Sequence, residues 1–119
     1  MKKILKHHTI SFKNAICGVV WAIKTQPNFR IHFILSLLAI GGGFYYQISY
    51  FEWLIILVMI FLGLTVEMIN TAIESTTDAI DHQWREEIKI AKDVAAGAML
   101  IVAVGALVVA VIIFLPKII

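Results

Sequence analysis

Apolar and polar side chains are interleaved along residues 4–25 and then separate into long apolar runs. Within residues 4–25, isoleucines, valines and Phe12 alternate with lysines and Asn14. An amphipathic helix carries apolar and basic side chains on opposite faces, so this pattern predicts a helix lying on a membrane surface. Pro27 interrupts the pattern, and we expect the surface helix to end just before it.

Two of the apolar runs have the length of a membrane span. Residues 31–48 are apolar apart from His32, Ser36 and Gln47, and residues 94–115 carry no charge. A helix crosses the bilayer core with about 20 predominantly apolar residues, so both runs are predicted spans. Pro116 follows the last run, and we expect the helix to end there.

The middle run is too short to span by itself. It extends from Trp53 to Val66, but its helical periodicity continues past Glu67 to about Ile80. We therefore predict a span over residues 52–72 whose last, charged turns leave the bilayer.

Composition agrees with this organisation. The chain has 119 residues, of which 61% are hydrophobic, and its mean hydropathy is +0.90. Three spans of about 20 residues leave no room for a separate soluble domain. We predict an all-α integral membrane protein in which residues 1–119 form a single domain. The net charge of +2 is too small for a nucleic-acid binder, and one cysteine excludes an internal disulfide.

Basic residues indicate the orientation in the cell membrane. Lysines and arginines lie in the N-terminal segment and in the loop before residue 94, whereas the linker 47–52 has none. The positive-inside rule therefore predicts a multi-pass protein with a cytoplasmic N-terminus and a cytoplasmic second loop. Lys117 is an exception on the other side, where tyrosines and Trp53 suggest an interfacial aromatic belt.

One face of the second predicted span is polar and acidic. Its residues are spaced 3, 4, 4 and 3 apart, and they are Glu67, Asn70, Glu74, Asp78 and Asp81. At about 100° per residue they share a stripe of roughly 80°. A carboxylate at the membrane centre costs about 2.5–3.5 kcal/mol, so Glu67 should face protein, water or a cation.

A second charged group opens the third predicted span, with Lys89, Lys92 and Asp93. We expect acids and a cation to meet across the loop, as in a magnesium-phosphate site. A solvated face or an ion pair explains Asp78 and Asp81 better, whereas Glu67 and Glu74 favour a functional site. Spacing alone leaves a lipid-modifying enzyme, a small ion or proton carrier and a structural subunit open. The nucleotide-binding loops of P-loop proteins and protein kinases are absent from the sequence.

The polar motifs together resemble a known family. Glu67-Met-Ile-Asn70-Thr-Ala-Ile-Glu74, then Asp78, Ala91-Lys92-Asp93 and Ala95-Ala96-Gly97-Ala98, closely resembles the signature of the prokaryotic diacylglycerol kinase family. The resemblance extends over nearly the whole chain. The Asn28-Phe29-Arg30-x-His32 segment and the Phe-Leu-Pro-Lys ending look most like the Gram-positive branch, whose members are generally undecaprenol kinases.

This resemblance implies a homotrimer of three-span subunits, each with a surface helix, whose active sites lie between neighbouring subunits at the cytoplasmic face. It also implies an enzyme that transfers the γ-phosphate of Mg-ATP to the hydroxyl of a lipid alcohol. Undecaprenol is the favoured substrate, on branch resemblance alone, and diacylglycerol is the alternative. The implied partners are thus ATP with Mg²⁺, the lipid, the membrane and two further copies of the chain.

The resemblance also assigns roles to individual residues. Glu67 matches the general base, and Asn70 is the polar residue beside it. Glu74 matches a magnesium ligand and also belongs to the ATP site. Lys92 and Asp93 match the pair that contacts the nucleotide.

The resemblance also suggests roles for four further residues. Arg30 and Ala96 are candidate contacts of the lipid substrate, although the cluster around Ala96 should mainly pack helices. Trp84 either stacks on adenine in the ATP site or anchors at the headgroups, and the anchor is favoured. Gln26 stands where the family usually has a second metal-binding glutamate, so we expect weaker magnesium and ATP binding there.

Overall fold

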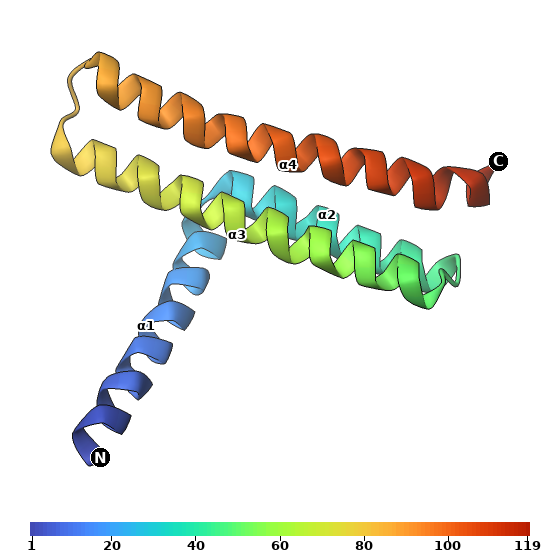
Figure 1. Ribbon diagram of the computed structural model, residues 1–119, viewed down its shortest axis with the longest axis horizontal. Coiled ribbons are helices and arrows are strands. Elements are labelled where there is room, and N and C mark those ends of the chain that lie inside the picture. Colours follow the sequence, from blue (N-terminus) through green and yellow to red (C-terminus); the bar gives the residue numbers. More distant parts are fainter.

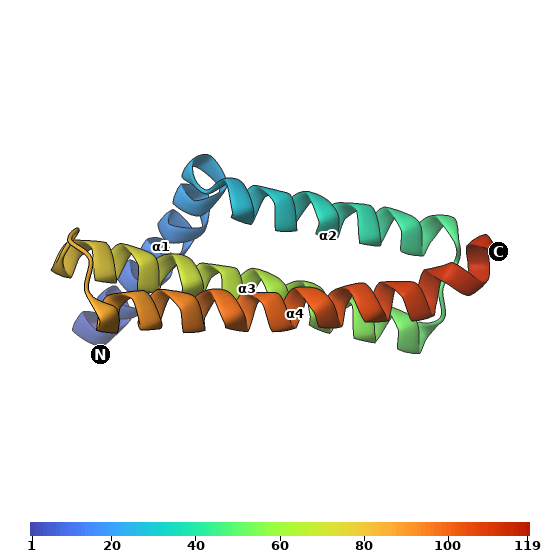
Figure 2. The same cartoon turned by 90° about the horizontal axis from the view of Figure 1, so that it is seen from above.

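The computed structural model consists of four helices: α1 (Lys2–Thr25), α2 (Pro27–Tyr45), α3 (Tyr50–Ile80) and α4 (Glu86–Ile118). It describes the backbone of the whole chain and the side chains of Met1 and residues 11–119. Helices α2, α3 and α4 run side by side, and α1 projects away from them at the start of α2 (Figures 1 and 2). The all-helical prediction is confirmed.

Gln26 forms the corner between α1 and α2. It ends one helix and precedes the next, with extended backbone angles of φ −104° and ψ 107°. The ring of Pro27 disfavours a helical conformation at the residue before it, and proline suits the first position of a helix. The apolar side chains of Phe12, Ile16 and Trp21 are exposed on α1. The helix is confirmed, and its placement on a membrane surface stays a prediction.

A tight turn joins α2 to α3. Gln47 has a positive φ of 49°, and Ser49 and Glu52 form a reciprocal capping box at the start of α3. Helix α2 therefore ends at Tyr45, and Ile48, where the first span was predicted to end, lies within the turn. Apolarity alone placed that boundary too late, because the turn residues are themselves apolar or neutral.

The best-packed part of the molecule lies beside this turn. Ile48, Ile56 and Ile113 are buried together and contact Trp53 and Phe114, among other partly buried side chains. On the same side, Lys117 Nζ of α4 donates to Glu52 Oε1 of α3 over 2.8 Å. Helices α2, α3 and α4 are thus tied together at the end opposite the α3–α4 loop.

Helix α4 is longer than the sequence predicted, and the prediction that Pro116 ends it is wrong. The helix runs from Glu86 to Ile118 with Pro116 inside it, and the N–H of Ile119 bonds to the carbonyl of Leu115 over 3.2 Å. Proline removes the backbone donor that would bond to the carbonyl of Ile112, but so near the helix end only this one helical bond is lost.

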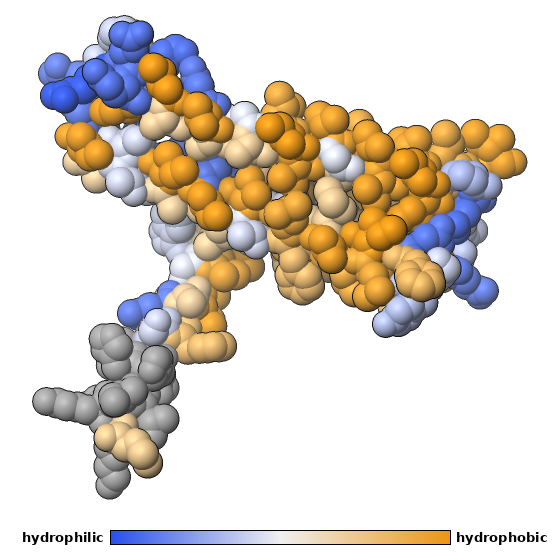
Figure 3. Space-filling view, in the orientation of Figure 1, coloured by the Kyte–Doolittle hydropathy of each residue, from blue (hydrophilic) through white to orange (hydrophobic). Residues whose placement is uncertain are grey.

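Helices α3 and α4 are each long and apolar enough to cross a bilayer. Within the described part of the chain α2 does not meet the same criteria, since Asn28, Arg30 and His32 occupy its first turns. The surface has a broad apolar band between a polar end at the α3–α4 loop and a smaller polar patch at the opposite end (Figure 3). These features are typical of a membrane protein.

Candidate active site

The most deeply buried polar residues lie on one face of α3. Glu67, Asn70, Thr71 and Thr77 are each exposed by 7% or less. The neighbouring apolar side chains of the same helix, such as Phe61 and Leu62, are largely exposed. A polar face turned inward with an apolar face turned outward is the arrangement expected for a helix in lipid, and it confirms that Glu67 faces protein.

Glu67 has one basic neighbour in the described part of the chain. The Oε2 atom of Glu67 lies 4.0 Å from Nε2 of His32 on α2. The sequence analysis did not connect these residues, because a single histidine on another helix gives no spacing signal.

Asn70 and Glu74 interact one turn further along α3. The amide nitrogen of Asn70 donates to Oε1 of Glu74 over 3.3 Å. The Oδ1 atom of Asn70 is buried and, among the described residues, has no hydrogen-bond partner. A buried acceptor without a partner costs roughly 1–3 kcal/mol, so this oxygen is well suited to a group from outside the single chain.

The α3–α4 loop forms a charged concavity of about 310 Å³. Lys92 Nζ donates to Asp78 Oδ1 over 2.6 Å, which confirms that an acid and a cation meet across the loop. Trp84 lines the same concavity, and its side chain is 76% exposed. Lys92, Asp93 and Trp84 thus share one surface.

A second ion pair braces the loop, with Arg85 Nε 2.8 Å from Asp81 Oδ2. The backbone N–H of Gln83 and the Arg85 guanidinium hold the pKa of Asp81 below its usual value, despite an opposing effect of desolvation. These contacts support a loop-stabilising role for Asp81, as the sequence analysis favoured.

The remaining predicted residues lie away from this loop, with Gln26 at the α1–α2 corner, Arg30 on α2 and Ala96 on α4. Gln26 donates its amide N–H to Oγ1 of Thr25 over 3.2 Å, and Arg30 and Ala96 are exposed. The α1–α2 corner lies level with the middle part of α3 along the long axis of the molecule (Figures 1 and 2). Within one chain the predicted site is therefore divided between the buried group on α3, the charged loop and this corner.

The donor set suits a metal ion that arrives with a phosphate ligand. No group of three His, Cys, Asp or Glu side chains gathers in Met1 and residues 11–119. Magnesium in nucleotide sites usually takes one or two protein carboxylates and completes its shell with phosphates and water. The exposed Glu74 carboxylate fits that chemistry.

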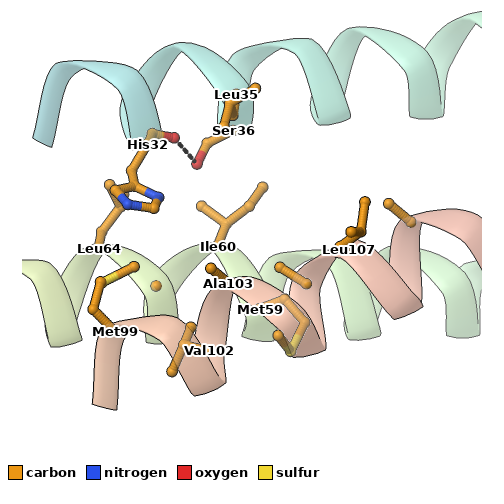
Figure 4. Close-up of a pocket in the computed structure, with 13 residues that line it drawn as sticks. His32, Leu35, Ser36, Met59, Ile60, Leu64, Met99, Val102, Ala103 and Leu107 are labelled. Atoms are coloured by element: carbon orange, nitrogen blue, oxygen red, sulfur yellow. Dashed lines mark hydrogen bonds between the residues drawn. The ribbon is translucent and has the colours of Figure 1, made fainter. Parts of the chain in front are cut away.

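A cavity of about 290 Å³ lies between α2, α3 and α4. His32 and Ser36 are its polar lining residues, and the other walls are apolar or glycine. In Figure 4 the imidazole of His32 extends from α2 toward α3 and lies beside Leu64. The cavity therefore has one polar edge, formed by His32 and Ser36, and His32 is also the neighbour of Glu67.

Comparison with known proteins gives consistent matches. Residues 13–114 match the family model of prokaryotic diacylglycerol kinase. The undecaprenol kinase of Bacillus subtilis is 37% identical over 107 residues, covering 90% of this chain and 87% of that protein. The diacylglycerol kinase of a Synechocystis strain is 35% identical over 108 residues, covering 90% of this chain and 62% of that protein. A Helicobacter pylori diacylglycerol kinase (strain 26695) is 36% identical over 84 residues, covering 71% and 66%.

Proposed function

Since this chain belongs to the prokaryotic diacylglycerol kinase family, a family of lipid kinases, we propose that it phosphorylates undecaprenol with Mg-ATP at the cytoplasmic membrane face. The observation that carries this proposal is the buried Glu67 carboxylate beside the Asn70–Glu74 pair. The choice of undecaprenol is supported by how much of each relative's length this chain matches. The chain spans 87% of the undecaprenol kinase and 62–71% of the diacylglycerol kinases.

Glu67 is the proposed general base. Its carboxylate takes the proton of the lipid hydroxyl while that oxygen bonds to the γ-phosphorus and the bond to ADP breaks. Phosphoryl transfer depends mainly on in-line positioning and charge neutralisation, so it requires no covalent enzyme intermediate. The position of Glu67 supports this role, because it lies just beyond an apolar stretch of α3, at the depth expected for the hydroxyl of a lipid alcohol.

Glu74 is the proposed protein ligand of magnesium, with a weak contribution from the carbonyl oxygen of Gln26, and Asn70 is the proposed polar residue beside the base. When bound, Mg²⁺ neutralises charge on the phosphates of ATP. The Asn70 amide fixes one oxygen of Glu74, so its other oxygen remains available.

Lys92 and Asp93 are the proposed nucleotide contacts, and Trp84 offers a ring for the adenine in the same concavity. Lys92 is now paired with Asp78, and their side chains are 39% and 49% exposed. An ion pair so exposed is worth about 0–1 kcal/mol. Breaking the Lys92–Asp78 ion pair so that Lys92 can bind the phosphates of ATP therefore costs little free energy.

The proposal includes a homotrimer of three-span subunits in which Arg30 and Ala96 contact the lipid. Asn70 Oδ1 lacks a partner among the described residues, and much apolar surface of α2 and α4 is exposed. Both observations support neighbouring chains packed in lipid. The cytoplasmic orientation of the N-terminus is supported by the lysines and arginines of the N-terminal segment and of the α3–α4 loop, which outnumber Lys117 on the other side.

The test is Glu67→Gln in the purified protein in lipid bilayers. The change is nearly isosteric but removes the base, so we expect transfer from ATP to undecaprenol to fall at least ~100-fold while assembly is retained. Normal turnover would remove Glu67 from this role. ATP-independent ion flux across sealed vesicles would instead favour the alternative function of a small ion or proton carrier.

A further inference from the structure

We propose that His32 is a positioning residue that acts through Glu67. This inference rests on the proposed function, because it assumes that Glu67 is the base. The two side chains come from different helices, α2 and α3, and their closest nitrogen and oxygen atoms are 4.0 Å apart. His32 thus places a polar side chain of α2 beside the proposed general base on α3.

In the described part of the chain, the other ion pairs involve neither Glu67 nor His32, so His32 is the basic partner of Glu67. Each remaining cation in these pairs has its own acid, and the pairs are Lys92–Asp78, Arg85–Asp81, Lys89–Asp93 and Lys117–Glu52. Arg30 precedes His32 by two positions, which is about 200° around a helix. Arg30 therefore lies on the opposite face of α2 and cannot replace the imidazole beside Glu67.

The surroundings of the pair make the contact effective. The Glu67 side chain is 4% exposed and that of His32 is 26% exposed. Nearby walls of the cavity are apolar, with Leu64 from α3 and Met99 from α4 (Figure 4). In such an environment an electrostatic or hydrogen-bond contact is stronger than in water, and an unpaired carboxylate costs more.

Ser36 does not compete for the imidazole. Its hydroxyl donates to the backbone carbonyl of His32 over 2.7 Å, and among the hydrogen bonds of the described residues none joins Ser36 to the imidazole. On α3, Glu74 is the nearest other acid along the same face, two turns from Glu67. The α4 residues that line the cavity carry no charge.

An imidazole N–H beside Oε2 can hold one carboxylate oxygen and direct the other, Oε1, toward the lipid hydroxyl. A small rotation or one bridging water closes the distance of 4.0 Å. Positioning partners of this kind usually change rates by about 10–100-fold, since a displacement of about 1 Å in a reacting group has effects of that size.

The test compares His32→Gln with His32→Leu in the full-length protein in bilayers, with ATP and undecaprenol. Glutamine keeps an N–H donor of similar reach, whereas leucine fills space without one. We expect kcat to fall about 10–100-fold in His32→Leu, with the KM of ATP within twofold, and to recover to within about threefold of wild type in His32→Gln. Ser36→Ala is the matched control on the next turn of α2, and its kcat should stay within twofold.

Two results would overturn the inference: wild-type kcat in His32→Leu, or equal losses in the leucine and glutamine variants, which would indicate packing alone. If His32→Leu does not assemble, His32→Asn replaces it, because asparagine keeps the amide but is too short to reach Glu67. Measuring the wild type and Glu67→Gln alongside these variants separates the test of Glu67 as the general base from the test of His32 as its positioning residue. Activity in the wild type that is lost in Glu67→Gln but unaffected at His32 would overturn only this inference.

Discussion

Glu67 and Asn70 are polar residues that are nearly inaccessible in a chain whose apolar side chains are mostly exposed. The sequence predicted that they share one face of a helix, because of their 3-residue spacing, and that Glu67 turns away from lipid toward protein, water or a cation. Which of these three it meets came from the structure. The contact between Glu67 and His32 could not be predicted in the same way. His32 lies on another helix, and residue spacing along one helix gives no information about its distance from a neighbouring helix.

Gln26 offers a test at the residue scale. Gln26→Glu adds a carboxylate where the family usually has one, so the magnesium concentration for half-maximal activity should fall about 10-fold. The change loses only a weak donor contact to Thr25 at an exposed position. Gln26→Ala provides the control and should raise the magnesium requirement. An unchanged requirement in both variants would remove position 26 from the metal site.

Lys92 offers a second residue-scale test. If its ammonium meets ATP phosphates, Lys92→Met loses a charged hydrogen bond of about 1.5–3 kcal/mol, and the KM of ATP should rise about 10–100-fold. Lys117→Met also breaks an ion pair, but at the opposite end of the bundle, so its KM for ATP should not change. Equal effects of the two substitutions would indicate a general loss of stability.

At the scale of elements, periodicity predicted that α3 continues past Glu67 to Ile80, and the structure confirms it. Two boundaries were wrong for local reasons. Helix α2 ends at Tyr45 because the chain turns at Gln47, and α4 passes through Pro116 because the proline falls in the last turn. Hydropathy registers neither a backbone turn nor the tolerance of a helix end for proline.

The packing of α2 against α3 depends on Gly43. A Cβ atom at this position would lie 2.7 Å from the Trp53 ring, whereas one at Gly41 would meet nothing within 4 Å. Gly43→Ala should therefore destabilise the protein by about 1–3 kcal/mol, and Gly41→Ala should be neutral or slightly stabilising. Unfolding in detergent measures both, and equal midpoints would contradict the close packing of these helices.

The whole molecule has its buried apolar cluster at one end and its candidate site toward the other. Composition predicted a membrane protein, and the two long apolar helices α3 and α4 agree with it. The proposed trimer rests instead on the apolar side chains of α2 and α4 that a single chain leaves exposed, and the proposed direction of insertion rests on the basic residues of the loops.

Orientation can be measured with single cysteines in a Cys17→Ser background. Gln83→Cys lies in the α3–α4 loop and Tyr50→Cys at the start of α3, and both positions are exposed. A membrane-impermeant maleimide should label Gln83→Cys only in inside-out vesicles and Tyr50→Cys only in right-side-out vesicles. The reverse pattern would place the candidate site on the outer face.

Phosphate transfer from γ-labelled ATP tests the central claim most directly. The purified protein in bilayers, with magnesium, would be offered undecaprenol and diacylglycerol in parallel, with Glu67→Gln as the inactive control. We predict a labelled lipid product in both cases, with kcat/KM at least ~10-fold higher for undecaprenol and at least ~100-fold less product from the variant. Preference for diacylglycerol would contradict the substrate assignment, and failure to label either lipid, even with glutamate at position 26, would contradict lipid kinase activity.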